Sequence, residues 1–459
     1  MVPRFKVHFR SGETSEQNHA PLIMFRSKAI VGVVFAFVVS AAMWLYVNRV
    51  LVAHQRADAA VSHTPRGNLS DLYPRWLGSR ELLLHGRDPY SKEVTREIQD
   101  GYYGRPLDPS RPDDPKDQQA FAYPVYVAFL LAPTVYSPFE AVRKGFDFLL
   151  FAITAASVWF WVEAMLWRTE LAALLIAAIL TLGSFPAVQG IKLDQLTLLV
   201  AGLIALCGFL LTRGQLFLAG GVLAISTIKP QLVAPLTGCL LVWALANWRA
   251  RKWFLWGLGS TMTLLLVGSE VVLPGWIGKF WVAIHEYVSY TGGISLIDRL
   301  LSPGSSKTVS AGIVVILLVL AWHLRREEPG SREFSLLLAK ILAGTLLIVP
   351  TFAPYNQVVL LPAVLLTARE WSETWRAGAI PKAMLAATVL ALGWPWAAAI
   401  GLVVASVRLP IEALRAVWYA PLYTVLAIPF VLLLDLAVLG GENPESQPAP
   451  KLAMSDGKL

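Results

Sequence analysis

Charged residues are scarce in this chain. Asp, Glu, Lys and Arg together make up 15% of its 459 residues, whereas soluble domains carry about 25%. Hydrophobic residues make up 56%, and the mean hydropathy is +0.55. Many apolar runs are roughly 17 to 25 residues long, the length that crosses the hydrocarbon core of a membrane as a helix. The scarcity of charge therefore excludes an ordinary soluble protein, and the sequence predicts an all-α polytopic membrane protein.

Cysteine and the motifs of several ligand sites are also nearly absent. The chain has two cysteines, Cys207 and Cys239, and both lie in apolar runs, where we expect small core residues rather than a disulfide or a metal pair. There is no Walker loop, no Gly-rich dinucleotide fingerprint after a strand and no HExxH motif. No soluble domain is large enough to bind a nucleotide sugar. We therefore expect no metal and no cofactor. If the protein is an enzyme, its activated substrate would reach it in the bilayer, carried on a lipid.

The net charge of +8 indicates membrane orientation and not a nucleic-acid partner, because Lys and Arg gather in the cytoplasmic loops of multispan proteins. Residues 1–28 are basic, so we expect a cytoplasmic N-terminus. The apolar run near 29–52 is interpreted as a retained first span rather than a signal peptide. A polar loop follows at about 54–118, and the helical spacing in RWLGSRELLLHG predicts a short amphipathic helix in the membrane interface. The predicted transmembrane domain covers 29–440, and 441–459 is expected to be a flexible cytoplasmic tail.

The other apolar runs predict about twelve transmembrane helices with both termini inside. The run 216–246 is too long for one ordinary span and contains IKPQ, so we expect two short helices joined by a turn at Pro230. The run 121–136 is expected to dip into the membrane without crossing it. This topology places the basic loops on the cytoplasmic side, except Arg143 and Lys144, which would face outward. An alternative topology with thirteen transmembrane helices, in which 121–136 crosses the membrane, therefore stays open.

Five segments that combine polar groups with prolines fall on the outer side in this topology. Non-helical backbone at membrane depth is tolerated only where it is buried in protein or lines a wet cavity. The simplest interpretation is one outward-facing cavity whose walls are the five segments 54–118, 184–195, 229–231, 274–307 and 352–357.

The two most notable ionisable residues of these segments each have a structural alternative. Asp71 could be the N-cap of the helix that follows it. Lys229 could extend its side chain to the membrane interface, as lysines near helix ends often do. Its place beside Pro230 at a turn makes a phosphate or lipid role about equally reasonable, because ionisable groups inside membranes are functional candidates.

Other polar residues also allow two interpretations. Asp194 and Gln195 could simply end a helix, and Tyr123 could belong to an ordinary interfacial aromatic belt. Asp147 and Glu163 could form structural pairs or part of a proton path.

The order of several short motifs resembles glycosyltransferase family 87. These motifs are SDLY, GRDPY, FAYPVYVAFLLAP, FP, DQLTLL, AGGVLAISTIKPQL and APYNQVVLLP, and together they cover roughly residues 30 to 365. The resemblance implies a GT-C-type fold and a mannosyltransferase that uses a polyprenyl-phosphate sugar donor, as do the phosphatidylinositol-mannoside mannosyltransferases of mycobacteria. It also implies a bacterial plasma membrane location with the active site facing outward.

The resemblance assigns the catalytic carboxylate to Asp71, because the family carries this group on its first outer loop. The GRDPY element contributes Asp88 and Tyr90, and the aromatic-proline pair that opens the next helix contributes Tyr123. The family often has Gly-Gln before a span, and here Gln195 matches while Asp194 replaces the glycine.

The later motifs add further residues to this expected site. Lys229 matches the lysine that follows the AGGVLAIS helix. The proline-bearing loop matches at Pro354, where some relatives have His or Trp and this chain has Tyr355, Asn356 and Gln357. These departures concern the identity of the acceptor and the sugar more than the fold.

The chemistry of glycosyl transfer explains why such residues are needed. An inverting transfer needs one carboxylate, here Asp71, to take the proton from the acceptor hydroxyl as it attacks the anomeric carbon. The leaving lipid phosphate needs cationic groups to stabilise its charge, and we expect Lys229 to serve, with Arg75 or Arg299 as helpers. The partners expected are thus the lipid-phosphate donor, a lipid or glycolipid acceptor and the membrane itself.

A second function fits part of the sequence, namely a polytopic transporter or lipid flippase. The broken helix at Lys229 and the acids Asp147 and Glu163 favour it, since interrupted helices and buried charges mark translocation pathways. Many transporters are built from internal repeats, and no repeat relates the two halves of this chain. The large asymmetric loop after the first span also favours the enzyme.

Overall fold

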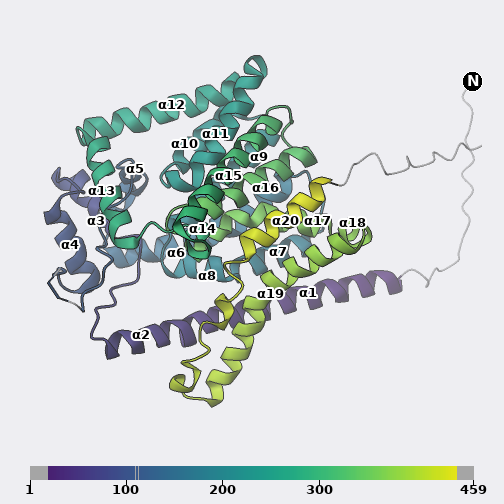
Figure 1. Cartoon of the computed structure of the whole chain (residues 1–459), viewed down its shortest axis with the longest axis horizontal. Coiled ribbons are helices and arrows are strands. Elements are labelled where there is room, and N and C mark those ends of the chain that lie inside the picture. Colours follow the sequence, from purple (N-terminus) through teal and green to yellow (C-terminus); the bar gives the residue numbers. More distant parts are fainter. Residues whose placement is uncertain (1–18, 109, 112, 442–459) are drawn as a thin grey trace, which may run out of the picture.

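The computed structural model describes residues 19–441 except 109 and 112, and this part of the chain is helical without a strand (Figure 1). The prediction of an all-α membrane protein is therefore confirmed. The predicted cytoplasmic N-terminus lies outside the described residues as far as residue 18, and so does the predicted tail from residue 442.

The helices follow one another with short connections over most of the chain. In the first half they are α1 (His19–Tyr46), α2 (Val52–Val61), α3 (Tyr73–His85), α4 (Lys92–Tyr103), α5 (Val127–Leu131), α6 (Phe139–Ala164), α7 (Leu171–Leu182), α8 (Phe185–Lys192), α9 (Leu196–Thr212) and α10 (Leu216–Ser226). In the second half they are α11 (Pro230–Ala246), α12 (Trp248–Val272), α13 (Trp276–Thr291), α14 (Leu296–Leu300), α15 (Pro303–Leu324), α16 (Arg332–Ile348), α17 (Leu361–Arg369), α18 (Trp371–Arg376), α19 (Ala379–Arg408) and α20 (Ile428–Gly441). A π-helical turn, η1 (Val47–Leu51), joins α1 to α2, and four 3-10 turns are η2 (Ala132–Thr134), η3 (Pro354–Leu360), η4 (Ile411–Leu414) and η5 (Ala420–Leu422).

The number of spans is lower than the twelve predicted. Among the described residues, five helices are long and apolar enough to cross a membrane, namely Lys28–Val61, α6, α12, α15 and α19. The pair α7 and α8, bent by 56°, makes six if it is one span. Several other apolar runs form helices of only 10–17 residues, and 17 residues of helix reach about 25 Å, which is less than the roughly 30 Å of the hydrocarbon core.

The short apolar helices are explained by where they lie in the bundle. Helix α9 is buried on nearly all sides, so its apolar composition reflects a protein core rather than contact with lipid. The run 216–246 forms α10 and α11 on either side of Lys229, with Pro230 in the first turn of α11, as predicted. The run 121–136 forms only the short elements α5 and η2, which are too short to cross a membrane.

The large loop after the first span folds into its own helices, and these gather with α5 and α13 at one end of the molecule (Figure 1, left). The sequence RWLGSRELLLHG forms α3, but this helix is buried over most of its surface and is not the amphipathic interfacial helix that we predicted. Helix α4 is the amphipathic one, since Val94, Ile98 and Tyr102 lie on one buried stripe and polar residues cover the rest.

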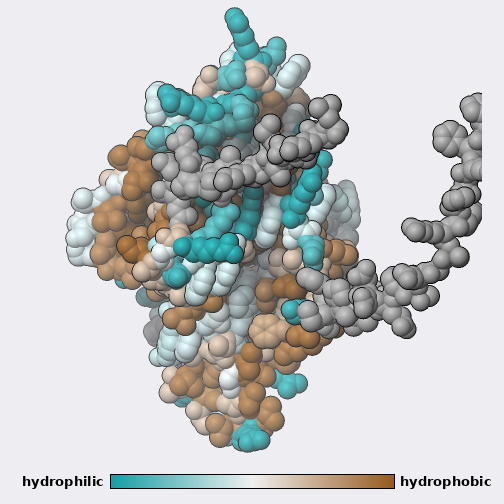
Figure 2. Space-filling model, turned by 90° about the vertical axis from the view of Figure 1, so that its right-hand side faces the viewer, coloured by the Kyte–Doolittle hydropathy of each residue, from teal (hydrophilic) through white to brown (hydrophobic). Residues whose placement is uncertain are grey.

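The basic loops meet at the opposite end, where α1 begins and α20 ends (Figure 1). The guanidinium of Arg251 pairs with Glu328 at 2.7 Å and donates to the carbonyl of Arg325 at 2.8 Å. The guanidinium of Arg369 donates to the carbonyl of Met165 at 2.9 Å. Figure 2 looks at this end and shows hydrophilic residues across its upper and central part, with hydrophobic residues along the left edge and below. This division agrees with basic loops on one side of a membrane and the 54–118 loop on the other.

Candidate active site

The segment that carries Asp71 is fixed by backbone hydrogen bonds to two distant elements. The N–H of Asn68 donates to the carbonyl of Tyr102 at 2.9 Å, and the N–H of Asp71 donates to the carbonyl of Leu193 at 2.8 Å. The N-cap of α3 is Leu72, with no side-chain cap. The carboxylate of Asp71 therefore does not cap the helix, and its backbone is held beside the turn that precedes α9.

A continuous chain of hydrogen bonds joins Asp71 to Lys229. The Gln195 side chain donates from Nε2 to Asp71 Oδ2 and accepts at Oε1 from Lys229 Nζ at 2.8 Å. Lys229 Nζ also donates to the hydroxyl of Thr197, which donates to Asn356 Oδ1 at 3.2 Å. No described residue donates to Asp71 Oδ1, so one carboxylate oxygen is oriented and the other is left for a ligand.

A second buried cation, Arg75, lies in the first turn of α3. Its guanidinium carbon is 4.6 Å from the centre of the Tyr123 ring, and Lys229 Nζ is 5.2 Å from the centre of the Tyr355 ring. Both cations are less than 10% exposed, and Arg75 Nε has no hydrogen-bond partner among the described residues. Buried charges are costly unless they are paired, and neither Arg75 nor Lys229 forms a salt bridge with a described residue, so the two cations indicate a site for an anion.

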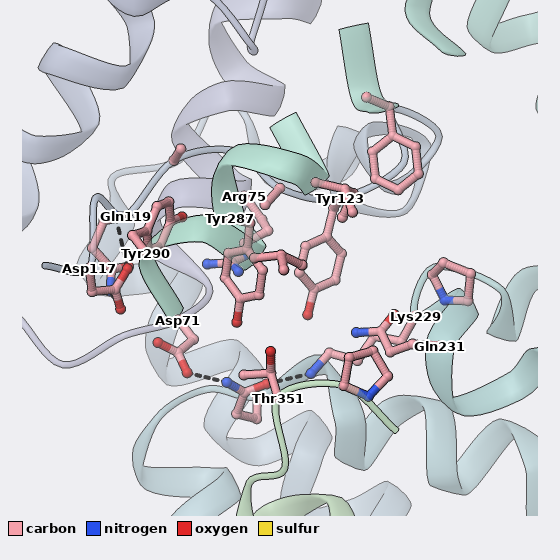
Figure 3. Close-up of a pocket in the computed structure, with 18 of the residues that line it drawn as sticks. Asp71, Arg75, Asp117, Gln119, Tyr123, Lys229, Gln231, Tyr287, Tyr290 and Thr351 are labelled. Carbon is pink, nitrogen blue, oxygen red and sulfur yellow. Dashed lines mark hydrogen bonds between the residues drawn. The ribbon is translucent and has the colours of Figure 1, made fainter. Parts of the chain in front are cut away.

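These groups line a partly open cavity of about 340 Å³ (Figure 3). Seven residues expected from the sequence lie in its wall, namely Asp71, Arg75, Tyr123, Gln195, Lys229, Tyr355 and Asn356. Its size and mixed polar and aromatic lining are typical of small-molecule sites. In the part of the chain that the structure describes, no three His, Cys, Asp or Glu side chains gather as a metal site.

Burial favours the neutral forms of Asp71 and Lys229, the two ionisable residues that Gln195 joins. Both lie outside the membrane-spanning helices. Burial raises the pKa of the Asp71 carboxyl, while Arg75 and Lys229 oppose that rise. Burial lowers the pKa of the Lys229 ammonium, and the charge of Arg75 lowers it further. A carboxylate with a raised pKa is a better base for a hydroxyl proton.

Four other expected residues lie outside the cavity wall. The Tyr90 hydroxyl donates to the carbonyl of Tyr123 at 2.6 Å, so it supports a residue of the wall. Asp88 pairs with Lys279 at 2.9 Å and accepts from the N–H of Tyr90. The remaining two are Gln357, which is buried and donates to the carbonyl of Val425, and Arg299, which is exposed on α14.

The cavity also contains residues that the sequence did not single out. They are polar or aromatic and come from the end of the large loop, from the first turn of α11, from α13 and from the segment before η3: Asp117, Gln119, Gln231, Phe280, Trp281, Tyr287, Tyr290 and Thr351. The three-residue spacing of Tyr287 and Tyr290 places both on one face of α13, which is a signal that the sequence did contain. Asp117 lies in a Pro- and Asp-rich stretch, and this composition predicts turns but no binding site.

Comparison with protein families finds one match, in which the model of glycosyltransferase family 87 covers residues 121–354. Tyr123, Gln195 and Lys229 lie inside the matched range, whereas Asp71 and Arg75 precede it. Comparisons with the curated proteins and with the solved structures find no match.

Proposed function

The chain belongs to glycosyltransferase family 87, and from this premise we propose that it transfers a mannosyl group from a polyprenyl-phosphate donor. The acceptor is a hydroxyl of a lipid-linked glycan or glycolipid at the outer face of a bacterial plasma membrane. The protein is a membrane glycosyltransferase with several apolar helices, and a GT-C-type arrangement is part of the proposal.

One observation carries this proposal, namely that the Asp71 carboxylate lines one cavity with two buried cations, Arg75 and Lys229, and is joined to Lys229 through Gln195. In the reaction, the acceptor oxygen forms a bond to the anomeric carbon while the bond from that carbon to the phosphate oxygen breaks. The electron pair of the broken bond stays on the lipid phosphate. Asp71 takes the proton of the acceptor hydroxyl, and Lys229 with Arg75 stabilises the phosphate charge.

The hydrogen-bond chain supports these roles. Gln195 donates to Oδ2 of Asp71, which leaves Oδ1 available to the acceptor hydroxyl. The same amide accepts from Lys229, which sets the distance between the base and the phosphate site. Apolar residues of α13 form another part of the wall, including Ile284 and Val288, and they offer a path for the prenyl tail of the donor.

The test uses the purified full chain in detergent micelles, radiolabelled polyprenyl-phosphate mannose and a membrane lipid extract. We expect a labelled lipid product with the native protein and a loss of about 10²- to 10⁴-fold in rate with Asp71→Asn, the range expected for a missing general base. Full activity of Asp71→Asn would rule out this base. In liposomes, movement of the donor across the bilayer without any covalent product would support the transporter or flippase alternative.

A further inference from the structure

The cavity has a second pole that the donor chemistry does not use. Figure 3 shows Asp117, Gln119 and Tyr290 on the side away from Lys229 and Gln231, with Asp71 between the two groups in this view. All of these residues line the same cavity. A carboxylate at this pole repels a phosphate, so the donor phosphate is directed to the cationic pole.

Asp117 and Gln119 form the polar part of this pole and are hydrogen-bonded to each other. Asp117 Oδ1 accepts from the N–H of Gln119 at 3.1 Å, and Oδ2 accepts from its Nε2 at 2.8 Å. The Tyr103 hydroxyl donates to the carbonyl of Asp117 at 2.9 Å, which fixes the segment to the end of α4. Gln119 has a positive φ of 51°, a strained conformation that surrounding contacts must hold in place for a residue other than glycine.

The Asp117 carboxylate can still accept hydrogen bonds from a ligand. An ionised carboxylate offers about four acceptor positions, and Gln119 uses two of them. Asp117 is exposed although it belongs to the cavity wall, so hydroxyl groups of a ligand can reach the remaining positions. Adjacent hydroxyls suit such a carboxylate, because it accepts from two donors at once.

Aromatic rings form the neighbouring wall. The rings of Tyr287 and Tyr290 are 5.4 Å apart at an interplanar angle of 74°, and Trp281 of the same helix also lines the cavity. A sugar ring presents hydroxyls at its edge and C–H groups on its faces, so carboxylate and amide groups next to aromatic rings match both of its surfaces.

We propose that Asp117, Gln119, Tyr287 and Tyr290 form the acceptor subsite and bind the neutral sugar or polyol headgroup of the acceptor. The acceptor is then a glycolipid or lipid-linked glycan with adjacent hydroxyls, and not a simple lipid alcohol or an acceptor with a charged phosphate at this position. This inference depends on the proposed function, because it needs Asp71 as the base and the cationic pole as the donor site.

The test measures transfer from radiolabelled polyprenyl-phosphate mannose to membrane lipid extract, with donor and extract varied separately. Asp117→Asn weakens charge-assisted hydrogen bonds to the acceptor, and we expect the half-saturating amount of extract to rise about 10- to 100-fold. The KM for the donor should stay unchanged. Tyr290→Leu, which removes the aromatic ring and keeps an apolar side chain, should raise the half-saturating amount of extract in the same direction without a change in donor KM.

The matched control is Asp113→Asn, which removes the same charge from an exposed position of the same segment outside the cavity wall. Its kinetics should equal those of the native protein, and thermal unfolding of each variant checks its fold. An equal change in donor KM, unchanged kinetics of both cavity variants, or a labelled product whose lipid carried no sugar or polyol before transfer would overturn the subsite. Absence of any covalent product with the native protein would instead overturn the proposed function, and the subsite with it.

Discussion

Asp71 and Lys229 are joined by a single side chain, that of Gln195. Its Nε2 donates to the carboxylate and its Oε1 accepts from the ammonium. An amide can do this because it carries a donor and an acceptor at fixed separation. The proposed base and the proposed phosphate-binding cation therefore cannot be positioned independently.

Replacement of Gln195 should change the proton affinity of the base. Gln195→Glu places a second carboxylate beside Asp71, and a like charge raises the pKa of its neighbour. We expect the acid limb of the rate profile to move to higher pH, whereas Gln195→Leu should lower kcat about 10-fold or more by releasing the orientation of Asp71. Rate profiles of both variants between pH 4 and 9 check this, and equal acid limbs in native protein and Gln195→Glu would contradict it.

The native rate profile should be a narrow bell. The carboxylate form of Asp71 is lost on acidification at a pH above the usual value of about 3.9, because burial raises its pKa. The cationic form of Lys229 is lost on alkalinisation below the usual value of about 10.4, because burial lowers its pKa. Lys229→Arg should move only the alkaline limb upward, since arginine stays charged. A native profile without an alkaline limb, or one that Lys229→Arg leaves in place, would argue against a phosphate role for this lysine.

Donor affinity should depend on Arg75 rather than on Arg299. Arg75 is buried beside Tyr123 in the cavity wall, whereas Arg299 is exposed outside it. We expect Arg75→Ala to raise the KM for the donor at least about 10-fold, the scale of a lost charged hydrogen bond, and Arg299→Ala to change it less than twofold. Initial rates at varied donor concentration measure both, and the opposite order would return the helper role to Arg299.

The ion pair between Arg143 and Asp194 should stabilise the turn before Gln195. Arg143 Nε is 3.2 Å from Asp194 Oδ2, and Asp194 is fully buried. Arg143→Gln leaves this carboxylate unpaired, and we expect a loss of about 2–3 kcal/mol, somewhat below the roughly 3–5 kcal/mol of a fully buried pair. Thermal unfolding in detergent micelles measures the change.

The second variant in this pair is Asp194→Gly. It removes the buried charge at a residue with φ of 50°, which glycine adopts without strain. Combined with Arg143→Gln, it should recover most of the lost stability. A double variant as unstable as Arg143→Gln alone would show that the buried carboxylate is not the cause.

Local sequence patterns were sufficient for much of the fold and for part of the site. Apolar composition indicated helices, Pro230 marked the break between α10 and α11, and Asp71, Lys229 and Gln195 were all singled out. The number of spans was wrong because composition does not distinguish a helix that faces lipid from one like α9 that is buried in protein. Asp117 and Tyr290 were missed because neither lies in a recognisable motif. Each becomes a candidate ligand-binding residue only because the fold places it in the same cavity wall as Asp71.

The sequence by itself determined the helical membrane class and the residue types that glycosyl transfer requires, because hydrophobicity and backbone chemistry act over a few turns of chain. Tertiary structure alone decided that Gln195 bridges Asp71 and Lys229, that Arg75 enters the cavity while Arg299 does not, and that α13 brings its tyrosines to Asp117. These relationships join segments far apart in the chain. The packing of whole helices sets the distances between their side chains, and no local pattern encodes those distances.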